Sequence, residues 1–289
     1  MTSLTPLVSG LSGMMDRYDA IISDVWGVLH NGVSATPGAG EALKAARESG
    51  KAVVLLTNAP RPPDSIRRQL TGFGVIDGIS DAIVSSGGVT RDLLAREGEA
   101  PFYHLGPARD RAIYEGLAAR PVSLDEARLI LCSGLFDDET EQAEDYRPML
   151  EEARRRNLQL ICANPDLVVE RGSDLLPCAG ALADLYEKLG GETIWVGKPH
   201  PLVYRYAREA IEQTLGRQVD PARILCIGDA LRTDVAGAGA AGHDCLMTLA
   251  GIHGHEINLD QGRFNRDLLE ALIATHEKRP IAVAISLVW

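Results

Sequence analysis

The sequence predicts an α/β fold with a mostly parallel sheet, organised as a core domain into which a second domain is inserted. Short apolar runs alternate with helix-like segments along nearly the whole chain, and this alternation is typical of strand–helix–strand units in a parallel sheet. Several runs towards the two ends of the chain finish in a polar side chain, whereas runs in the middle third hardly do so. A length of 289 residues is also long for a single core and favours about two domains.

Asp24 closes the apolar run 20–23 and precedes a turn. A carboxylate at the carboxyl end of a buried strand lies where an open α/β sheet carries its chemistry. Three later runs end in the same way. The polar residues that close or follow the four runs are Asp24, Thr57, Asn58, Lys198, Asp229 and Asp234. We expect these strand ends to meet around a single pocket that binds a divalent cation.

Helix and strand signals locate the other elements. Pro37 and Gly50 lie where a helix favours proline and glycine, at its start and just past its end. The predicted helices are 37–49, 64–72 and 146–157, with a further helix after Asp234. The predicted strands are 20–23, 53–56, 82–88, 101–105, 128–132, 158–163, 194–196, 224–228 and a terminal strand at 280–289.

An insertion explains why polar strand ends are nearly absent from the middle of the chain. We predict a core formed by residues 1–88 and 191–289, and an inserted domain formed by residues 89–190. We expect the inserted domain to act as a lid over the strand ends of the core, selecting the substrate and excluding bulk water.

Composition excludes several classes of function. The formal net charge of −11 argues against nucleic acid or an anionic membrane surface as the main partner. The five cysteines lack metal-ligand spacing, which favours reduced, buried thiols in a cytoplasmic protein. The first 15 residues lack the features of a signal peptide, and no segment is long enough to span a bilayer. The sequence leaves a homo-oligomer open.

The residue types at the strand ends suit phosphoryl transfer, which depends on positioning and on charge neutralisation. A carboxylate such as Asp24 can attack phosphorus and form an aspartyl-phosphate that water then hydrolyses. We expect Mg²⁺ between the two anions, bound by Asp24 and Asp229. Lys198 would add a point charge, and Thr57 and Asn58 would donate hydrogen bonds to the phosphate oxygens.

Four stretches of the chain resemble the ordered motifs of the haloacid dehalogenase superfamily. They are DVWGVL at 24–29, LTN at 56–58, GKP at 197–199 and GDALRTD at 228–234. The inserted segment, with Asn-Pro-Asp at 164–166, resembles the class IIA branch of sugar-phosphate and related phosphatases. The resemblance covers nearly the whole chain. It implies a Rossmann-like, doubly wound parallel-sheet core with an inserted α/β cap domain, and Mg²⁺-dependent hydrolysis of a small phosphorylated metabolite.

The resemblance also implies a role for each motif residue. Asp24 would be the nucleophile, Lys198 the charge stabiliser, and Asp166 a residue that faces the substrate. Thr57 and Asn58 would bind the phosphate. The implied metal site consists of Asp24, the backbone carbonyl of Trp26, Asp229 and, in a supporting role, Asp234.

Trp26 departs from the family pattern. Phosphatases of the superfamily usually carry an aspartate two residues after the nucleophile, which protonates the leaving oxygen and then activates water. An indole offers only an N–H donor, and loss of a positioned acid/base lowers rates by about 10²- to 10⁴-fold.

Three interpretations follow from Trp26. Phosphatase turnover persists on good leaving groups, with His30 or a metal-bound water as the substitute acid/base, since His30 lies just beyond the motif and titrates in the useful range. Alternatively, the chain catalyses a reaction of the superfamily that needs no leaving-group acid. In the third interpretation it is a non-catalytic protein that binds phosphorylated metabolites.

Overall fold

The structure is a computed structural model, and it describes residues 4–171, 174–259, 262 and 264–289. The contacts divide it into two compact units. The first unit comprises the chain up to Thr57 together with Ile66–Val84 and Lys198–Trp289, and the second comprises Asn58–Ser65 and Ser85–Gly197. The long segment of the second unit runs from Ser85 to Gly197, whereas the sequence suggests 89 to 190, so the strand predicted at 194–196 for the core belongs to the second unit. That the second unit acts as a cap stays a prediction.

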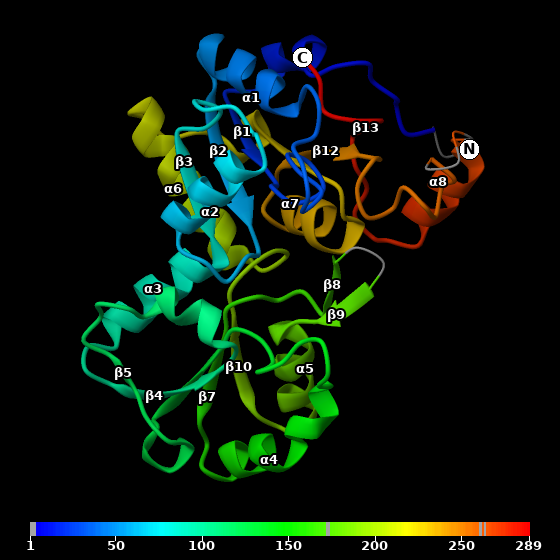
Figure 1. Ribbon diagram of the computed structural model, residues 1–289. Helices are drawn as coiled ribbons and strands as arrows, with labels where there is room; N and C mark the ends of the chain where they lie inside the picture. The colour runs from blue at the N-terminus through cyan, green and yellow to red at the C-terminus, as the bar shows by residue number, and fades with distance from the viewer. Residues whose placement is uncertain (1–3, 172–173, 260–261, 263) are drawn as a thin grey trace. The chain divides into compact units, whose positions relative to one another are not determined.

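The first unit is built on a six-stranded sheet with the order β13-β12-β11-β1-β2-β3. Every pairing from β13 to β2 is parallel, which confirms the predicted α/β class, and Figure 1 shows helices packed around the sheet. The strands are β1 (Ala20–Ser23), β2 (Ala52–Thr57), β3 (Ala82–Ser85), β11 (Ile224–Gly228), β12 (Asp244–Thr248) and β13 (Ala282–Ala284). The α-helices are α1 (Ala39–Glu48), α2 (Pro63–Gly72), α6 (Pro201–Leu215), α7 (Ala236–Ala240) and α8 (Arg266–Ala274), and α2 begins within the second unit.

The central strands are apolar up to their last residues because helices bury both faces of the sheet. All residues of β1, β2 and β11 are buried, which is the pattern of a parallel sheet covered on both sides. Ser23 at the end of β1 is aligned with Leu55 on β2 and with Ile227 on β11. The three strands therefore end within two residues of one another, and Asp24 follows the middle one.

The second unit has its own parallel sheet of five strands, in the order β10-β7-β6-β4-β5. These strands are β4 (Pro101–Leu105), β5 (Arg120–Pro121), β6 (Leu129–Cys132), β7 (Gln159–Cys162) and β10 (Glu192–Trp195). An antiparallel pair, β8 (Val168–Arg171) and β9 (Asp174–Pro177), lies outside that sheet. The helices are α3 (Ser86–Arg96), α4 (Arg147–Arg155) and α5 (Ala179–Lys188). One core holds the unit together, and its fully buried side chains include Ile130, Leu150, Leu182 and Tyr186.

Two predicted strands differ from the structure. Residues 86–88 open helix α3 and do not continue β3, because the Ser85 side chain accepts a hydrogen bond from the N–H of Gly88 and so caps the helix. The predicted terminal strand at 280–289 is confined to Ala282–Ala284. At its end, the N–H groups of Leu249 and Ala250 donate to the carbonyls of Ala284, the last residue of the strand, and of Ile285, the residue after it.

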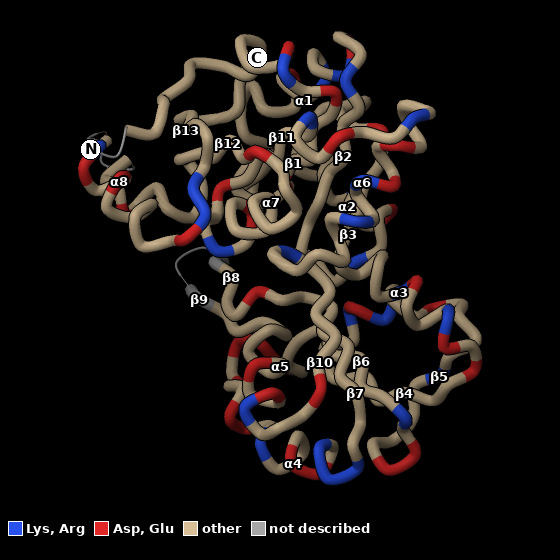
Figure 2. Tube along the Cα trace, turned by 180° about the vertical axis from the view of Figure 1, so that it is seen from behind, with Lys and Arg blue, Asp and Glu red and all other residues tan. Residues whose placement is uncertain are grey.

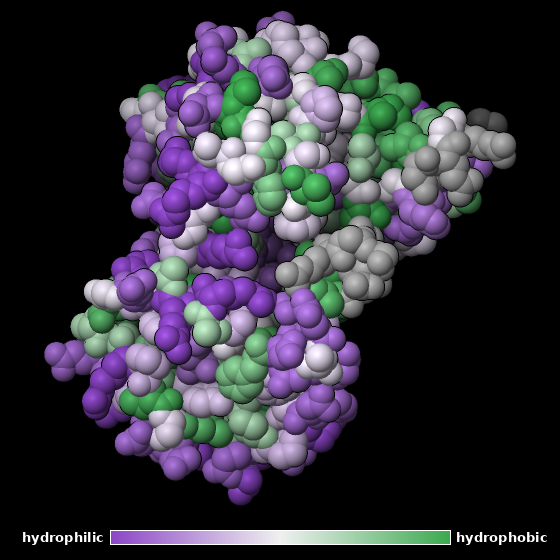
Figure 3. Space-filling view, in the orientation of Figure 1, coloured by the Kyte–Doolittle hydropathy of each residue, from purple (hydrophilic) through white to green (hydrophobic). Residues whose placement is uncertain are grey.

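Charged and apolar residues are distributed as expected for helices packed on sheets. Acidic and basic residues are intermingled along α4 (Figure 2), where Arg155 pairs with Glu152. Apolar residues also reach the surface (Figure 3), and Leu268 on α8 is 40% exposed. None of the helices in the described part of the chain combines the length and hydropathy needed to cross a membrane.

Candidate active site

Asp24 lies at the carboxyl end of the central strand of the first unit. Its N–H donates to the carbonyl of Ile227 at 2.7 Å, which extends the β1–β11 ladder by one residue and fixes the backbone of Asp24. The side chain of Asp24 is buried, as are those of Lys198, Asp229 and Asp234. The fold therefore gathers residues that are far apart in the sequence.

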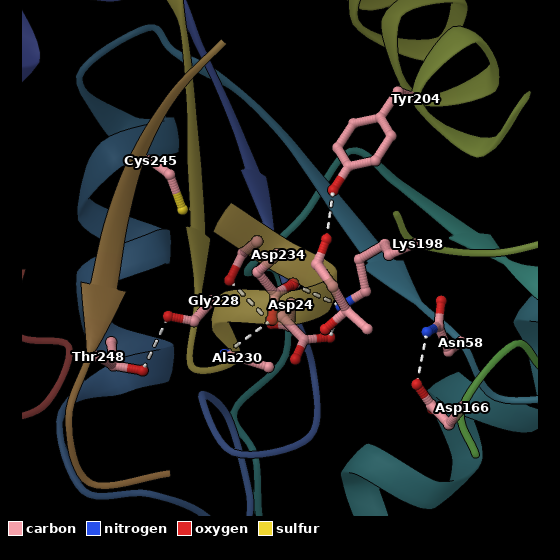
Figure 4. A network of polar contacts seen from close by, with 12 residues as sticks. Asp24, Asn58, Asp166, Lys198, Tyr204, Gly228, Ala230, Asp234, Cys245 and Thr248 are labelled. Atoms are coloured by element: carbon pink, nitrogen blue, oxygen red, sulfur yellow. Dashed lines mark hydrogen bonds and ion pairs between the residues drawn. The ribbon is translucent and has the colours of Figure 1, made fainter. Parts of the chain in front are cut away.

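Lys198 joins two of the carboxylates. Its Nζ atom lies 2.5 Å from Oδ1 of Asp24 and 2.7 Å from Oδ1 of Asp234, and Figure 4 shows the ammonium between the two acids. The second oxygen of Asp234 accepts a hydrogen bond from the N–H of Ala230 at 3.1 Å. Asp234 thus fixes both the lysine and the turn that follows β11, so its position depends on more than one contact.

Asp229 is surrounded by backbone. Its Oδ2 atom accepts a 2.8 Å hydrogen bond from the N–H of Ile252. A methyl group added at Gly27 or at Gly251 would lie 2.0 Å from that same oxygen, so only glycine permits the approach of these two segments. Gly27 has a φ of +82°, a conformation that glycine adopts without strain.

The three carboxylates form one cluster with an excess of negative charge. One carboxylate oxygen from each of Asp24, Asp229 and Asp234 lies within 4.8 Å of the other two. Burial raises the pKa of Asp24, and the neighbouring carboxylates add to that effect while Lys198 opposes it. Burial also raises the pKa of Asp229 to about 7, with Asp234 contributing. Lys198 loses solvation on burial, but Asp234 and Asp24 outweigh that loss and raise its pKa, so the lysine is charged.

This cluster fits a divalent metal ion. Buried carboxylate oxygens that converge on one point are the donors that Mg²⁺ prefers. Three carboxylates face a single ammonium, and a second cation would relieve the repulsion that raises the pKa of Asp229. Asp24, Asp229 and Asp234 are the side chains that would hold the ion.

Trp26 and His30 pack against each other on the loop that follows Asp24. Their ring centroids lie 5.1 Å apart, and His30 also packs on Phe73 at 4.6 Å. A methyl group added at Gly32 would lie 2.5 Å from Cη2 of Trp26, so the indole rests on the Gly32 backbone. Trp26 remains 38% exposed.

The surroundings of His30 disfavour the acid/base role suggested by its sequence position. His30 is only 2% exposed, and its Nδ1 atom accepts a 3.0 Å hydrogen bond from the N–H of Gly32. Burial lowers the pKa of His30 to about 4, so the imidazole is neutral near pH 7. We therefore do not propose His30 as the substitute acid/base.

The phosphate-binding candidates follow β2. Thr57 is the last residue of that strand and is buried. Asn58 belongs to the second unit and donates from Nδ2 to Oδ1 of Asp166 at 2.9 Å (Figure 4). Asp166 therefore contacts Asn58, a contact that the sequence did not suggest.

Sequence reasoning missed the glycines that enclose Asp229. Gly251 follows β12, which pairs with β11, so it lies beside the strand end that carries Asp229. The sequence does contain a further, mostly apolar run at 245–249, and Ala250 and Gly251 follow it directly. A small residue at a strand end is as informative as a polar one where backbone must approach a carboxylate.

Comparison with known proteins identifies the family. A family model described as haloacid dehalogenase-like hydrolase matches residues 21–119, and a second, HAD-hydrolase-like model matches residues 195–272. A crystal structure of a hydrolase of the haloacid dehalogenase-like family from Brucella suis 1330 is 45% identical, has a TM-score of 0.84, and aligns over 98% of this chain and 100% of that chain. The protein belongs to the haloacid dehalogenase-like hydrolase family.

More distant relatives cover most of the chain. Human chronophin is 29% identical over 262 residues, which is 84% of this chain and 85% of chronophin. Ribonucleotide monophosphatase NagD of Escherichia coli K12 is 27% identical over 235 residues, or 80% of this chain and 88% of that protein. Phosphatases are thus found among the relatives of this chain.

Proposed function

We propose that this protein is a class IIA phosphatase that hydrolyses a small phosphorylated metabolite through an aspartyl-phosphate on Asp24. The observation that carries the proposal is the buried group of Asp24, Asp229 and Asp234 around Lys198. The family and its phosphatase members support the reaction class. The metabolite is of the sugar-phosphate type or similar in size.

Asp24 would supply the nucleophile. One of its carboxylate oxygens bonds to phosphorus while the bond from phosphorus to the ester oxygen breaks. Water then attacks the aspartyl-phosphate, releases inorganic phosphate and restores the carboxylate. Lys198 has the geometry to hold Asp24 in position, because its ammonium also bonds Asp234 and is thereby fixed.

Two kinds of group would help the phosphate to approach Asp24. The hydroxyl of Thr57 and the amide of Asn58 would donate to the phosphate oxygens. Bound Mg²⁺ would neutralise negative charge on the phosphate and on the carboxylates. The residues that would hold it are Asp24, Asp229 and Asp234, with the backbone carbonyl of Trp26.

Trp26 determines which esters are hydrolysed fast. The indole packs on Gly32 and His30 and carries no proton that it could give up near neutral pH. An ester whose leaving oxygen is already a weak base, such as an aryl phosphate, needs no such proton. We propose that turnover is fast for these esters and impaired for alkyl phosphates.

The presence of Trp26 where an acid/base would be expected supports a second candidate function. Without an acid/base beside Asp24, the protein would bind phosphorylated metabolites and release them unchanged. In that case Asp24, Lys198 and the metal site would serve affinity alone.

An assay with p-nitrophenyl phosphate and an alkyl phosphate separates the two functions. The phosphatase proposal predicts turnover of the aryl ester that a chelator abolishes and that Asp24→Asn abolishes. Retention of phosphate and Mg²⁺ binding without turnover of either ester would establish the binding protein. Turnover that survives Asp24→Asn would exclude both, because the reaction would then take place elsewhere.

A cytoplasmic location is part of the proposal. All five cysteines are buried and unpaired, as expected in a reducing compartment. The partner is the phosphorylated metabolite, and neither nucleic acid nor a membrane surface suits a chain of net charge −11.

A further inference from the structure

The second unit contains a topological switch point of its own. From β4 the chain passes to β5 on one side and then returns to β6 on the other side of β4. In an open parallel sheet, the crevice at the carboxyl ends of two such strands is where ligands bind. β4 ends at Leu105 and β6 at Cys132, and the register aligns these two residues.

A cavity of about 570 Å³ is lined by residues of β4 and of the segment that follows it, and its lining also includes Pro121 at the end of β5 and Phe136 beyond β6. Its volume is within the range of small-molecule sites. Three aromatic side chains line it, those of Tyr103, Tyr114 and Phe136, together with His104 and Arg111. Phe136 is 47% exposed. The cavity thus offers aromatic surface to a ligand and a guanidinium beside it.

A chain of hydrogen bonds borders the cavity. Nε2 of His104 lies 3.0 Å from Oγ of Ser133, and the hydroxyl of Tyr114 lies 3.3 Å from Nδ1 of His104. The Ser133 hydroxyl bonds the buried carboxyl of Asp110. One assignment of protons satisfies every contact: Tyr114 donates to His104, His104 to Ser133, and Ser133 to Asp110.

The backbone around this chain is tightly fixed. A methyl group added at Gly106, which follows β4, would lie 2.1 Å from Oγ of Ser133. Arg91 on α3 donates to the carbonyls of Ala112, Ile113 and Glu115 and so fastens the segment that carries Arg111. The walls of the cavity are therefore held in place without a ligand.

Arg111 places a positive charge at the cavity. Within the described residues, no carboxylate lies within 4.0 Å of the Arg111 guanidinium, whereas the nearby Arg109 is paired with Asp138. Burial and the charge of Arg111 lower the pKa of His104 to about 4, so the imidazole adds no charge near pH 7. An anionic ligand would meet Arg111 as its counter-ion.

We propose that this cavity binds a planar aromatic or heteroaromatic anion, with the ring against Tyr103, Tyr114 and Phe136 and the acidic group on Arg111. The aromatic walls favour a flat ring. A guanidinium favours a carboxylate or phosphate oxygen, which it can bind through two hydrogen bonds. The site lies entirely within the second unit and does not depend on turnover at Asp24.

Calorimetric titration of the full chain with 2-naphthoate tests the proposal. This probe has a flat ring and one carboxylate but no phosphate. We expect one binding site per chain. Arg111→Gln should weaken binding at least tenfold, as expected for loss of a charge-assisted hydrogen bond, and Phe136→Ala should weaken it severalfold. Both side chains are exposed, so neither substitution should unfold the protein.

Two controls separate charge recognition at this site from non-specific binding. Naphthalene-2-carboxamide keeps the ring but lacks the charge, and it should bind at least tenfold more weakly than 2-naphthoate. Arg155→Gln removes an exposed arginine of the same unit, and it should leave the dissociation constant unchanged within twofold. Absence of binding to the wild-type protein, or equal binding by Arg111→Gln, would overturn the proposal.

Discussion

The amide of Asn58 is held by the carboxylate of Asp166, a residue 108 positions further along the chain, through a 2.9 Å hydrogen bond from Nδ2 to Oδ1. The surroundings leave Asn58 little freedom. A methyl group added at Gly197 would lie 2.7 Å from Oδ1 of Asn58 and 2.3 Å from the ring of Pro165. Because a carboxylate repels phosphate, we propose that Asp166 orients the Asn58 amide and does not itself bind the substrate.

Replacement of Asp166 should therefore weaken phosphate binding through Asn58. Asp166→Ala should lower kcat/KM about five- to tenfold, the usual effect of one lost hydrogen bond, and by the same factor for every phosphate ester. Asp166→Asn keeps an acceptor oxygen and should stay close to wild type. In combination with Asn58→Ala, the loss caused by Asp166→Ala should disappear. Additive losses, or losses that vary with the ester, would show that Asp166 contacts the substrate instead.

Substitution of Trp26 tests whether the site lacks an acid/base. Trp26→Asp should raise kcat for alkyl phosphates by about 10- to 100-fold, part of the usual contribution of a positioned acid, and should change p-nitrophenyl phosphate turnover little. Trp26→Asn is the matched control, because it removes the indole without supplying a titratable proton. Equal rates for the two variants, or slower alkyl-ester turnover by Trp26→Asp, would contradict our interpretation of Trp26.

Lys198 should contribute to stability as well as to chemistry. Lys198→Met leaves the carboxylates of Asp24 and Asp234 buried without their cation, and loss of one partner of a buried pair costs about 3–5 kcal/mol. Denaturant unfolding measures that loss. Lys188→Met removes an exposed lysine paired with Asp184, and should change the free energy of unfolding by less than about 0.5 kcal/mol. If the two substitutions lowered the free energy of unfolding by similar amounts, the stabilising role of Lys198 between the buried carboxylates would be refuted.

Asp110 should make stability depend on pH. Burial raises the pKa of Asp110 from 3.8 to about 6, so between these values the folded state binds more protons than the unfolded state. Its contribution to stability is therefore complete below pH 3.8 and falls as the pH rises to about 6, by about 3 kcal/mol in total.

Asp110→Asn removes this titration, so its stability relative to wild type should rise between pH 4 and pH 7. Urea unfolding of both proteins across that range measures the difference. A constant difference would contradict a raised pKa for Asp110.

The sequence revealed the residues that lie at strand ends. Asp24 and Asp229 were found because parallel strands bring their carboxyl ends to one edge of a sheet, so apolar runs that end in polar groups predict a shared site. Lys198 follows β10, which belongs to the sheet of the second unit, so this argument does not account for its contact with Asp24. The fold class follows from the same alternation and is confirmed by the parallel sheets.

Features that depend on neighbouring strands or on loop packing were not accessible from the sequence. Gly251 contacts Asp229 only because β12 lies beside β11. His104 and Ser133 are 29 residues apart and meet because β4 pairs with β6. His30 is buried because Phe73 and Trp26 pack against it. The residues around His30 in the sequence do not predict this packing.

Calorimetric titration of Mg²⁺ into the wild-type protein and into Asp229→Asn measures whether the carboxylate cluster binds a metal ion. If Asp24, Asp229 and Asp234 share one cation, the wild-type protein binds one Mg²⁺ per chain and Asp229→Asn loses that binding, while Asp16→Asn, an exposed acid in the same unit, binds as wild type. Equal Mg²⁺ binding by the wild-type protein and Asp229→Asn would contradict the account, as would absence of binding to the wild-type protein.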